Sequence, residues 1–238
     1  MTSEQPFAHR LVAEALGTLL LLSAVVGSGV MAQRLADGNG GIALLCNTVA
    51  TGTALVVLIT VFGPLSGAHF NPAVTVFFAI RREIAWCHAA AYAVVQIIAA
   101  IAGVWLAHAM FGMPVIEVSR KLRDGPSQWL SEFVATFGLL LTIAGCARKP
   151  DTTPALVGLY ISAAYWFTAS TSFANPAVTL ARSLTDSFAG IAPASVPGFL
   201  CGQIVAVLAV YPVACYLFGH LSSPGPSTRQ LLKIVLGQ

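Results

Sequence analysis

Charged side chains are scarce in this sequence. Asp, Glu, Lys and Arg account for 9% of its 238 residues, whereas about 25% is usual in a soluble domain. At this density, charges cannot cover a water-facing surface, so the composition excludes an ordinary soluble protein. Hydrophobic residues make up 57% of the chain and are spread from end to end. The sequence therefore predicts a single membrane domain over residues 1–238.

Residue clusters that carry catalysis or bind metals are also missing from the sequence. The five cysteines are isolated within apolar stretches, and the histidines are dispersed. No Ser/His pair or His/Cys/Asp cluster occurs at a catalytic spacing, so we expect no enzyme activity, no metal site and no cofactor. The net charge of +3 is small and scattered, which gives no reason to expect nucleic acid as a partner.

Six apolar stretches are each about 20 residues long, which is the length that crosses a bilayer. They are Ala8–Val30, Ile42–Phe62, Ile84–Met110, Gln128–Ala147, Thr153–Ser170 and Val196–Gly219. Two further apolar segments, His69–Ile80 and Phe173–Ala181, are about half as long. We expect six transmembrane helices and two half-helices that enter the membrane without crossing it.

The two halves of the chain, about 8–110 and 128–219, correspond to each other. The segment Phe70–Thr75 reads FNPAVT and recurs at Ala174–Thr179 as ANPAVT, and Glu14 near the start of the first half matches Glu132 in the second. Each half holds three spans, with a half-span after the second. Because three is an odd number, the second copy must be inverted in the membrane, and the two half-helices then meet near its middle.

The repeated Asn-Pro-Ala motif suits the start of a helix, because Asn is a favoured N-cap and Pro is favoured at the first helical position. A capping Asn accepts a bond with its carbonyl oxygen and leaves its amide NH₂ free to donate into the space in front. Two facing helix N-termini also bring together two partial positive charges of roughly +0.5 each. Such a site binds acceptor oxygens and repels cations. We predict a pore site at Asn71, Pro72, Ala73, Asn175, Pro176 and Ala177.

These residues closely resemble the aquaporin and aquaglyceroporin family. The segment Ser66–Thr75, which reads SGAHFNPAVT, is nearly the family's first signature loop, and the resemblance covers essentially the whole chain. It implies an all-α membrane protein of six transmembrane helices plus two re-entrant half-helices in an inverted 3+3 repeat. It also implies a homotetramer in the bacterial inner membrane, with a pore in each protomer. The implied function is passive passage of water and small neutral solutes, with exclusion of protons and ions.

The expected constriction of the pore departs from the usual family pattern. Most members have Arg three residues after the second motif Asn, where this chain has Val178, and water-selective members have Phe where it has Thr51. Ser172 occupies a third filter position. The fourth is Ala163 or Tyr165, and Tyr165 is favoured if the family alignment allows a two-residue deletion. This wide filter resembles a bacterial branch linked to arsenic resistance, which implies polyols such as glycerol and uncharged metalloid hydroxides such as arsenite as solutes.

Glu14 and Glu132 are the only acidic residues inside the predicted spans, and a carboxylate at that depth is a candidate functional group. One hypothesis is that each accepts backbone N–H groups from a pore loop, which the family resemblance supports, with His69 as a further loop support. The alternative is an inverted-repeat secondary carrier that uses Glu14 and Glu132 for ion coupling.

Arg182 lies seven residues after Asn175. Seven helical steps return to within about 20° of the Asn face and advance about 10 Å along the axis. Arg182 could therefore lie in the outer vestibule and partly replace the missing filter cation. The alternative is that it caps the half-helix or faces lipid headgroups and loop acids such as Asp186.

The placement of Lys and Arg mildly favours a cytoplasmic N-terminus and C-terminus. In that orientation seven basic residues lie inside and five outside. The inside set is Arg10, Arg81, Arg82, Arg148, Lys149, Arg229 and Lys233, and the outside set is Arg34, Arg120, Lys121, Arg123 and Arg182.

Overall fold

The computed structural model describes residues 5–219, so Arg229 and Lys233 of the charge count lie outside the described residues. The α-helices are α1 (Phe7–Leu35), α2 (Gly40–Ser66), α3 (Pro72–Ile80), α4 (Trp86–Phe111), α5 (Pro126–Cys146), α6 (Thr153–Phe167), α7 (Pro176–Ala181) and α8 (Val196–Phe218). Three short 3₁₀ helices are η1 (Pro150–Thr152), η2 (Arg182–Leu184) and η3 (Pro193–Ser195). Residues 5–219 contain no strand, and the predicted all-α fold is confirmed.

Five of the described helices are long and apolar enough to cross a membrane, namely α1, α2, α4, α5 and α8 with its preceding η3. The sixth predicted span corresponds to α6, which has only 15 residues. It ends before the predicted boundary at Ser170 because Thr168 adopts extended backbone, with φ −111° and ψ 139°. The chain leaves the helix there and enters the loop that leads to Asn175.

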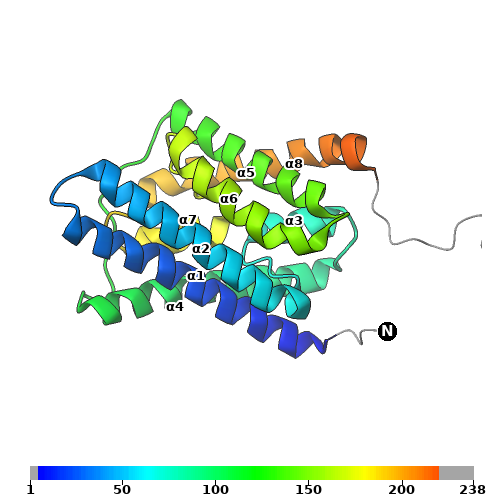
Figure 1. The fold of residues 1–238 in the computed structure, drawn as a ribbon, viewed down its shortest axis with the longest axis horizontal. Coiled ribbons are helices and arrows are strands. Elements are labelled where there is room, and N and C mark those ends of the chain that lie inside the picture. The colour runs from blue at the N-terminus through cyan, green and yellow to red at the C-terminus, as the bar shows by residue number, and fades with distance from the viewer. Residues whose placement is uncertain (1–4, 220–238) are drawn as a thin grey trace, which may run out of the picture.

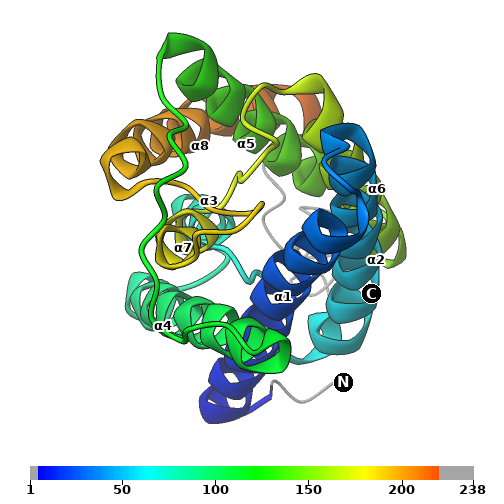
Figure 2. The same ribbon diagram turned by 90° about the vertical axis from the view of Figure 1, so that its left-hand side faces the viewer.

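The long helices surround the two short ones. α1 packs against α2 and α4, α5 packs against α8, and α6 packs against both α2 and α5. Figure 2, which looks along the bundle, shows these helices around an open middle, with α7 and α3 at one side between α4 and α8. Both short helices contact α4 and α8. The two halves of the chain therefore build one enclosure around α3 and α7.

The short helices lie toward opposite ends of the bundle. In Figure 1, α1 begins and α8 ends at the same end, which we call the near end, and α3 lies toward it. α7 lies toward the opposite end, which we call the far end (Figure 1). The segment that joins α4 to α5 crosses the far end in front of α7 (Figure 2). This arrangement is what an inverted repeat predicts.

Glycine allows α2 and α6 to approach closely. A Cβ added to Gly158 of α6 would lie 2.7 Å from the Gly52 carbonyl oxygen, and one added to Gly52 would lie 2.0 Å from Ser162 Oγ. Both distances are too short for real side chains. Small residues at such contacts let helix backbones approach closely. In a bilayer the hydrophobic effect does not drive helices together, so this close packing stabilises their association.

Candidate pore and filter

The two Asn-Pro-Ala motifs begin α3 and α7 by the same geometry. Asn71 Oδ1 accepts a hydrogen bond from Ala73 N at 2.8 Å. Asn175 Oδ1 accepts from Ala177 N at 3.0 Å and from Val178 N at 3.3 Å. Proline follows each cap at the first helical position, where its missing N–H has no bond to lose. The N-terminus of each half-helix therefore points into the bundle interior.

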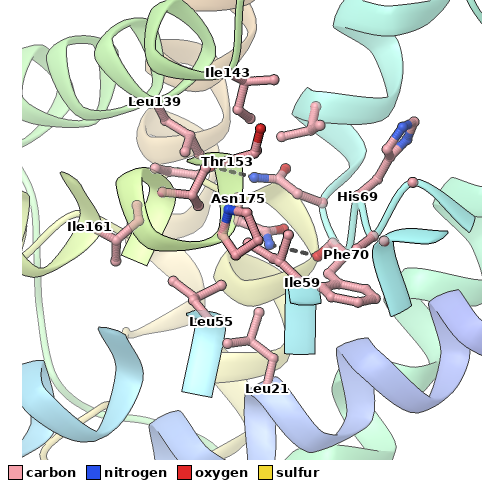
Figure 3. Close-up of a pocket in the computed structure, with 18 of the residues that line it drawn as sticks. Leu21, Leu55, Ile59, His69, Phe70, Leu139, Ile143, Thr153, Ile161 and Asn175 are labelled. Atoms are coloured by element: carbon pink, nitrogen blue, oxygen red, sulfur yellow. Dashed lines mark hydrogen bonds between the residues drawn. The ribbon is translucent and has the colours of Figure 1, made fainter. Parts of the chain in front are cut away.

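The two caps also hold each other across the molecule. Asn71 Nδ2 donates to the Ala174 carbonyl at 2.8 Å, and Asn175 Nδ2 donates to the Phe70 carbonyl at 2.9 Å. Figure 3 shows the bond between Asn175 and Phe70 as a dashed line. The accepting residues have positive φ, 47° at Ala174 and 48° at Phe70. Each Asn amide thus donates one of its two N–H groups to a carbonyl of the opposite loop. The expectation that both N–H groups of each amide are free to donate into the pore is wrong. One donor on each amide remains for a solute.

A buried carboxylate holds each motif loop. Glu14 of α1 accepts bonds from Ser66 Oγ, His69 N, Phe70 N and Gln96 Nε2, at 2.7 to 2.9 Å. Glu132 of α5 accepts from Phe173 N and Ala174 N at 2.8 Å and from Gln203 Nε2 at 2.6 Å. Backbone donors at this depth need such partners because no lipid group can replace them.

Two glutamines that the sequence analysis did not single out complete these networks. Gln96 of α4 also donates to Thr75 Oγ1 at 3.1 Å, and Gln203 of α8 donates to Thr179 Oγ1 at 2.8 Å. Thr75 and Thr179 are the last residues of the repeated ANPAVT-like segment. The signal was present in the sequence, since each glutamine is an isolated polar amide in the middle of an apolar span.

A cavity of about 820 Å³ runs past both motifs. Its lining includes Asn71 and Asn175, together with Arg81, Glu83 and Asp151 near one end and Arg182 near the other. Figure 3 shows Asn175 facing into this space, with Leu21, Leu55 and Ile161 around it. Most of the wall is apolar, and the polar groups are few and convergent, as in sites that orient small solutes. Neither Glu14 nor Glu132 lines this cavity.

The four proposed filter residues all line this cavity. Tyr165 OH donates to Thr51 Oγ1 at 3.2 Å, and both side chains are buried. Ala163, the alternative to Tyr165, is exposed and does not line the cavity. Val178 is 6% exposed. Ser172 Oγ is buried and has no hydrogen-bond partner among the described residues.

His69 lies at the first motif loop and also lines the cavity. Its Nδ1 is 3.1 Å from Thr75 Oγ1, and its ring stacks on Phe78 with centroids 4.7 Å apart. Its backbone N–H is one of the donors to Glu14. These contacts are consistent with the support role that we predicted for this residue.

Basic side chains gather at the far end, where the α4–α5 segment meets the chain after α7. Arg120 forms an ion pair with Asp186 at 2.7 Å, and the Arg120 N–H and guanidinium groups lower the pKa of the Asp186 carboxyl. Burial, followed by repulsion from Arg123 and Arg182, lowers the pKa of Lys121 to about 8. Burial also lowers the pKa of Arg123 to about 10. Arg182 is 2% exposed.

Comparison with known proteins gives consistent results. The family model described as "Major intrinsic protein" matches residues 1–172. The chain is 54% identical over 228 residues to the aquaglyceroporin AqpS of Rhizobium meliloti (strain 1021), with 95% of this chain and 96% of that protein covered. It is 29% identical to aquaporin NIP1-1 of Oryza sativa subsp. japonica, with 86% of this chain and 72% of that protein covered.

A solved structure has the same fold. The X-ray structure of the aquaglyceroporin from Plasmodium falciparum superposes with a TM-score of 0.64 and covers 92% of this chain and 98% of that one. Its sequence identity of 19% means that this likeness speaks to fold alone.

Proposed function

This chain belongs to the major intrinsic protein family and is an integral membrane protein, and from that premise we propose that it is a passive channel for water and small neutral solutes. The observation that supports this most directly is the cavity that both Asn71 and Asn175 line. Two helix N-termini and two amide donors face one apolar passage there, so a hydroxyl or water oxygen finds donors while a cation is repelled. We propose that protons and ions are excluded for this reason.

The filter composition favours solutes larger than water. Val178 and Thr51 are small, and Tyr165 is tied to Thr51 by its hydroxyl, so it is held to one side. Three hydroxyl-bearing side chains and one aliphatic one suit a compact molecule with several hydroxyls. We therefore propose glycerol-like polyols and uncharged metalloid hydroxides such as arsenite as solutes. The aquaglyceroporin named among the relatives is consistent with this class.

We also propose a homotetramer in the bacterial inner membrane, with both termini in the cytoplasm. Large apolar side chains are exposed on the long helices, for example Val49 and Val57 of α2 and Leu159 and Trp166 of α6, all more than half exposed. Lipid or neighbouring protomers would cover such faces. In this orientation the near end of the bundle is cytoplasmic and the far end is external.

The alternative of an ion-coupled carrier finds no support in the positions of its candidate coupling residues. Glu14 and Glu132 are fully buried and lie outside the cavity. Their hydrogen bonds come from loop N–H groups and from neighbouring polar side chains. A coupling ion needs a site on the transport path that opens to each side in turn.

Stopped-flow light scattering on proteoliposomes tests the proposal. Purified protein should accelerate the shrinkage caused by water efflux and the re-swelling caused by glycerol or arsenite entry, relative to protein-free liposomes. Val178→Trp, which places a large ring in the filter, should abolish these effects. Flux should rise linearly with solute gradient and should not depend on a pH gradient. Saturating, counterflow-stimulated or proton-dependent uptake would instead indicate a carrier.

A further inference from the structure

The guanidinium group of Arg182 is held in an unusual way for a residue at the end of a helix. Its Nε donates to the Ala189 carbonyl oxygen, and its Cζ lies 3.4 Å from the centroid of the Phe173 ring. It bonds neither to the last carbonyls of α7 nor to Asp186, which pairs with Arg120. The side chain is therefore positioned by the loops on either side of α7 and not by the helix that it follows.

The two Nη nitrogens of this guanidinium group are free to donate hydrogen bonds into the cavity. Within residues 5–219, the two Nη nitrogens of Arg182 have no hydrogen-bond partner, and Arg182 lines the cavity. No carboxylate forms an ion pair with it there. A buried cation without a carboxylate partner is costly, so the protein retains this charge against a stability penalty.

A second polar group without a protein partner lines the same cavity. Ser172, which immediately precedes Phe173, lines the same cavity, is 3% exposed, and has an Oγ with no partner among the described residues. Buried hydroxyls nearly always have a partner, in the protein or in ordered solvent. Ser172 and Arg182 both line this cavity, and each has a side-chain polar atom without a hydrogen-bond partner among the described residues. Polar groups of this kind in a mostly apolar cavity are suited to orient a solute oxygen.

Arg123 shows that this placement is specific to Arg182. Its Cζ lies 5.2 Å from the same Phe173 ring, and it is similarly buried. However, Arg123 donates to the carbonyls of Gly190, Ser170 and Phe188 and to Thr171 Oγ1, and it does not line the cavity. Arg123 ties the α4–α5 segment to the loops at the far end, whereas Arg182 has donors to spare.

We propose that Arg182 is the fixed cation of the far-end filter and that, with Ser172 Oγ, it binds an acceptor oxygen of the passing hydroxylated solute. Arg182 lies four residues after Val178, so the charge sits one helical turn farther toward the far end. Because the guanidinium is held on Phe173 and Ala189, it contributes charge without narrowing the constriction at Val178. The filter is thereby wide for solute yet closed to cations. This inference rests on the proposed channel function.

The test compares wild type with Arg182→Met, which removes the charge, and with Arg182→Gln, which removes the charge but keeps a donor for the Ala189 carbonyl. Arg123→Met is the matched control at the same aromatic ring. Proton and Na⁺ conductance is measured in proteoliposomes under a clamped diffusion potential, together with water and glycerol flux. Thermal unfolding in detergent reports on folding.

Both Arg182 variants should leak protons or Na⁺ about tenfold or more above wild type, as expected when a unit charge within several ångströms of the ion path is removed. Their glycerol flux should fall relative to water flux, because a donor for the solute oxygen is lost. Arg123→Met should unfold at lower temperature without a leak. Adding Val178→Arg to Arg182→Gln should return a cation to the filter and suppress the leak.

If Arg182→Met does not fold, the cation leak and the glycerol-to-water flux ratio of Arg182→Gln test the proposal. A folded Arg182→Gln with wild-type tightness to cations and an unchanged glycerol-to-water ratio would overturn the proposal. That result differs from failure of the channel function itself, because in the latter case wild-type protein would conduct neither water nor glycerol.

Discussion

The carboxylate of Glu132 accepts hydrogen bonds from buried donors in the loop before α7 and in α8. These donors are the backbone N–H groups of Phe173 and Ala174 and the side chain of Gln203. Ser172 and Ala174 in the same loop have φ of 51° and 47°, a left-handed conformation that costs a residue with a Cβ roughly 1–2 kcal/mol. The glutamate therefore stabilises a loop that would not keep this shape alone.

Glu132→Ala should lower the free energy of unfolding by about 4 kcal/mol, because it leaves several buried donors unsatisfied. Glu132→Gln should cost about half of this, because one acceptor oxygen remains. Thermal unfolding in detergent measures both. Loss of a pH-gradient-dependent flux in a fully stable Glu132→Gln variant would contradict this role and support proton coupling.

Val178 is the residue at which this filter departs most from the family pattern that it resembles. Val178→Arg should lower the ratio of glycerol flux to water flux about tenfold, because a long side chain narrows the passage and removes a few kcal/mol of favourable fit for the larger solute. Stopped-flow measurements on proteoliposomes give both fluxes. Val178→Leu, which adds bulk without charge, is the control. Equal loss of water and glycerol in a folded Val178→Arg protein would indicate simple blockage.

At the scale of elements, α3 and α7 act as a pair. Each is too short to cross the membrane, and each begins at an Asn whose amide bonds the loop in front of the other. Their N-termini therefore cannot separate without breaking two hydrogen bonds. The long helices around them fix this meeting point through close contacts at small residues.

The α2–α6 contact offers a direct test of that enclosure. Gly158→Ala should destabilise the protein by about 1–3 kcal/mol, because the new methyl group overlaps the Gly52 carbonyl and forces the helices apart. Gly145→Ala in α5 is the matched control, since its Cβ would meet only the Phe218 ring, at 3.4 Å. That change should be neutral or slightly stabilising, as expected for Gly→Ala in a helix. Thermal unfolding that ranked the two variants in the opposite order would be evidence against the tight α2–α6 contact.

At the scale of the whole molecule, the inverted repeat places the two halves on opposite sides of one cavity. The near end carries the start of α1 and the end of α8, and the far end carries the α4–α5 segment with its basic residues (Figures 1 and 2). The charge count along the sequence mildly favours the proposed orientation, in which the near end faces the cytoplasm.

Cysteine labelling in intact cells tests this orientation. Leu122 lies in the α4–α5 segment and is 75% exposed, and Arg148 is an exposed residue after α5, at the near end. Leu122→Cys should react with a membrane-impermeant maleimide in intact cells, whereas Arg148→Cys should react only after permeabilisation. The wild-type protein gives the background from its own cysteines. The reverse labelling pattern would show that the termini are outside.

Much of the fold follows from the sequence by itself. The length of the apolar runs predicts the membrane spans and the two half-helices. The repeated segment, together with three spans in each half, predicts the inversion. Both patterns can be read from the sequence alone. The pairing of Glu14 with the first motif and Glu132 with the second was also predictable, because a carboxylate at that depth needs donors and the motif loops need acceptors.

Only the tertiary structure decided how the site is assembled, because its bonds join residues far apart in the chain. The partners in the bonds between Asn71 and Ala174 and between Asn175 and Phe70 are 103 and 105 residues apart, so no local pattern reports them. The choice of Tyr165 over Ala163 depended on which face of α6 turns toward the cavity. The different surroundings of Arg123 and Arg182 depended on two loops meeting at Phe173. Sequence periodicity predicts which residues share a helix face, but the contacts of that face are set only when distant segments pack together.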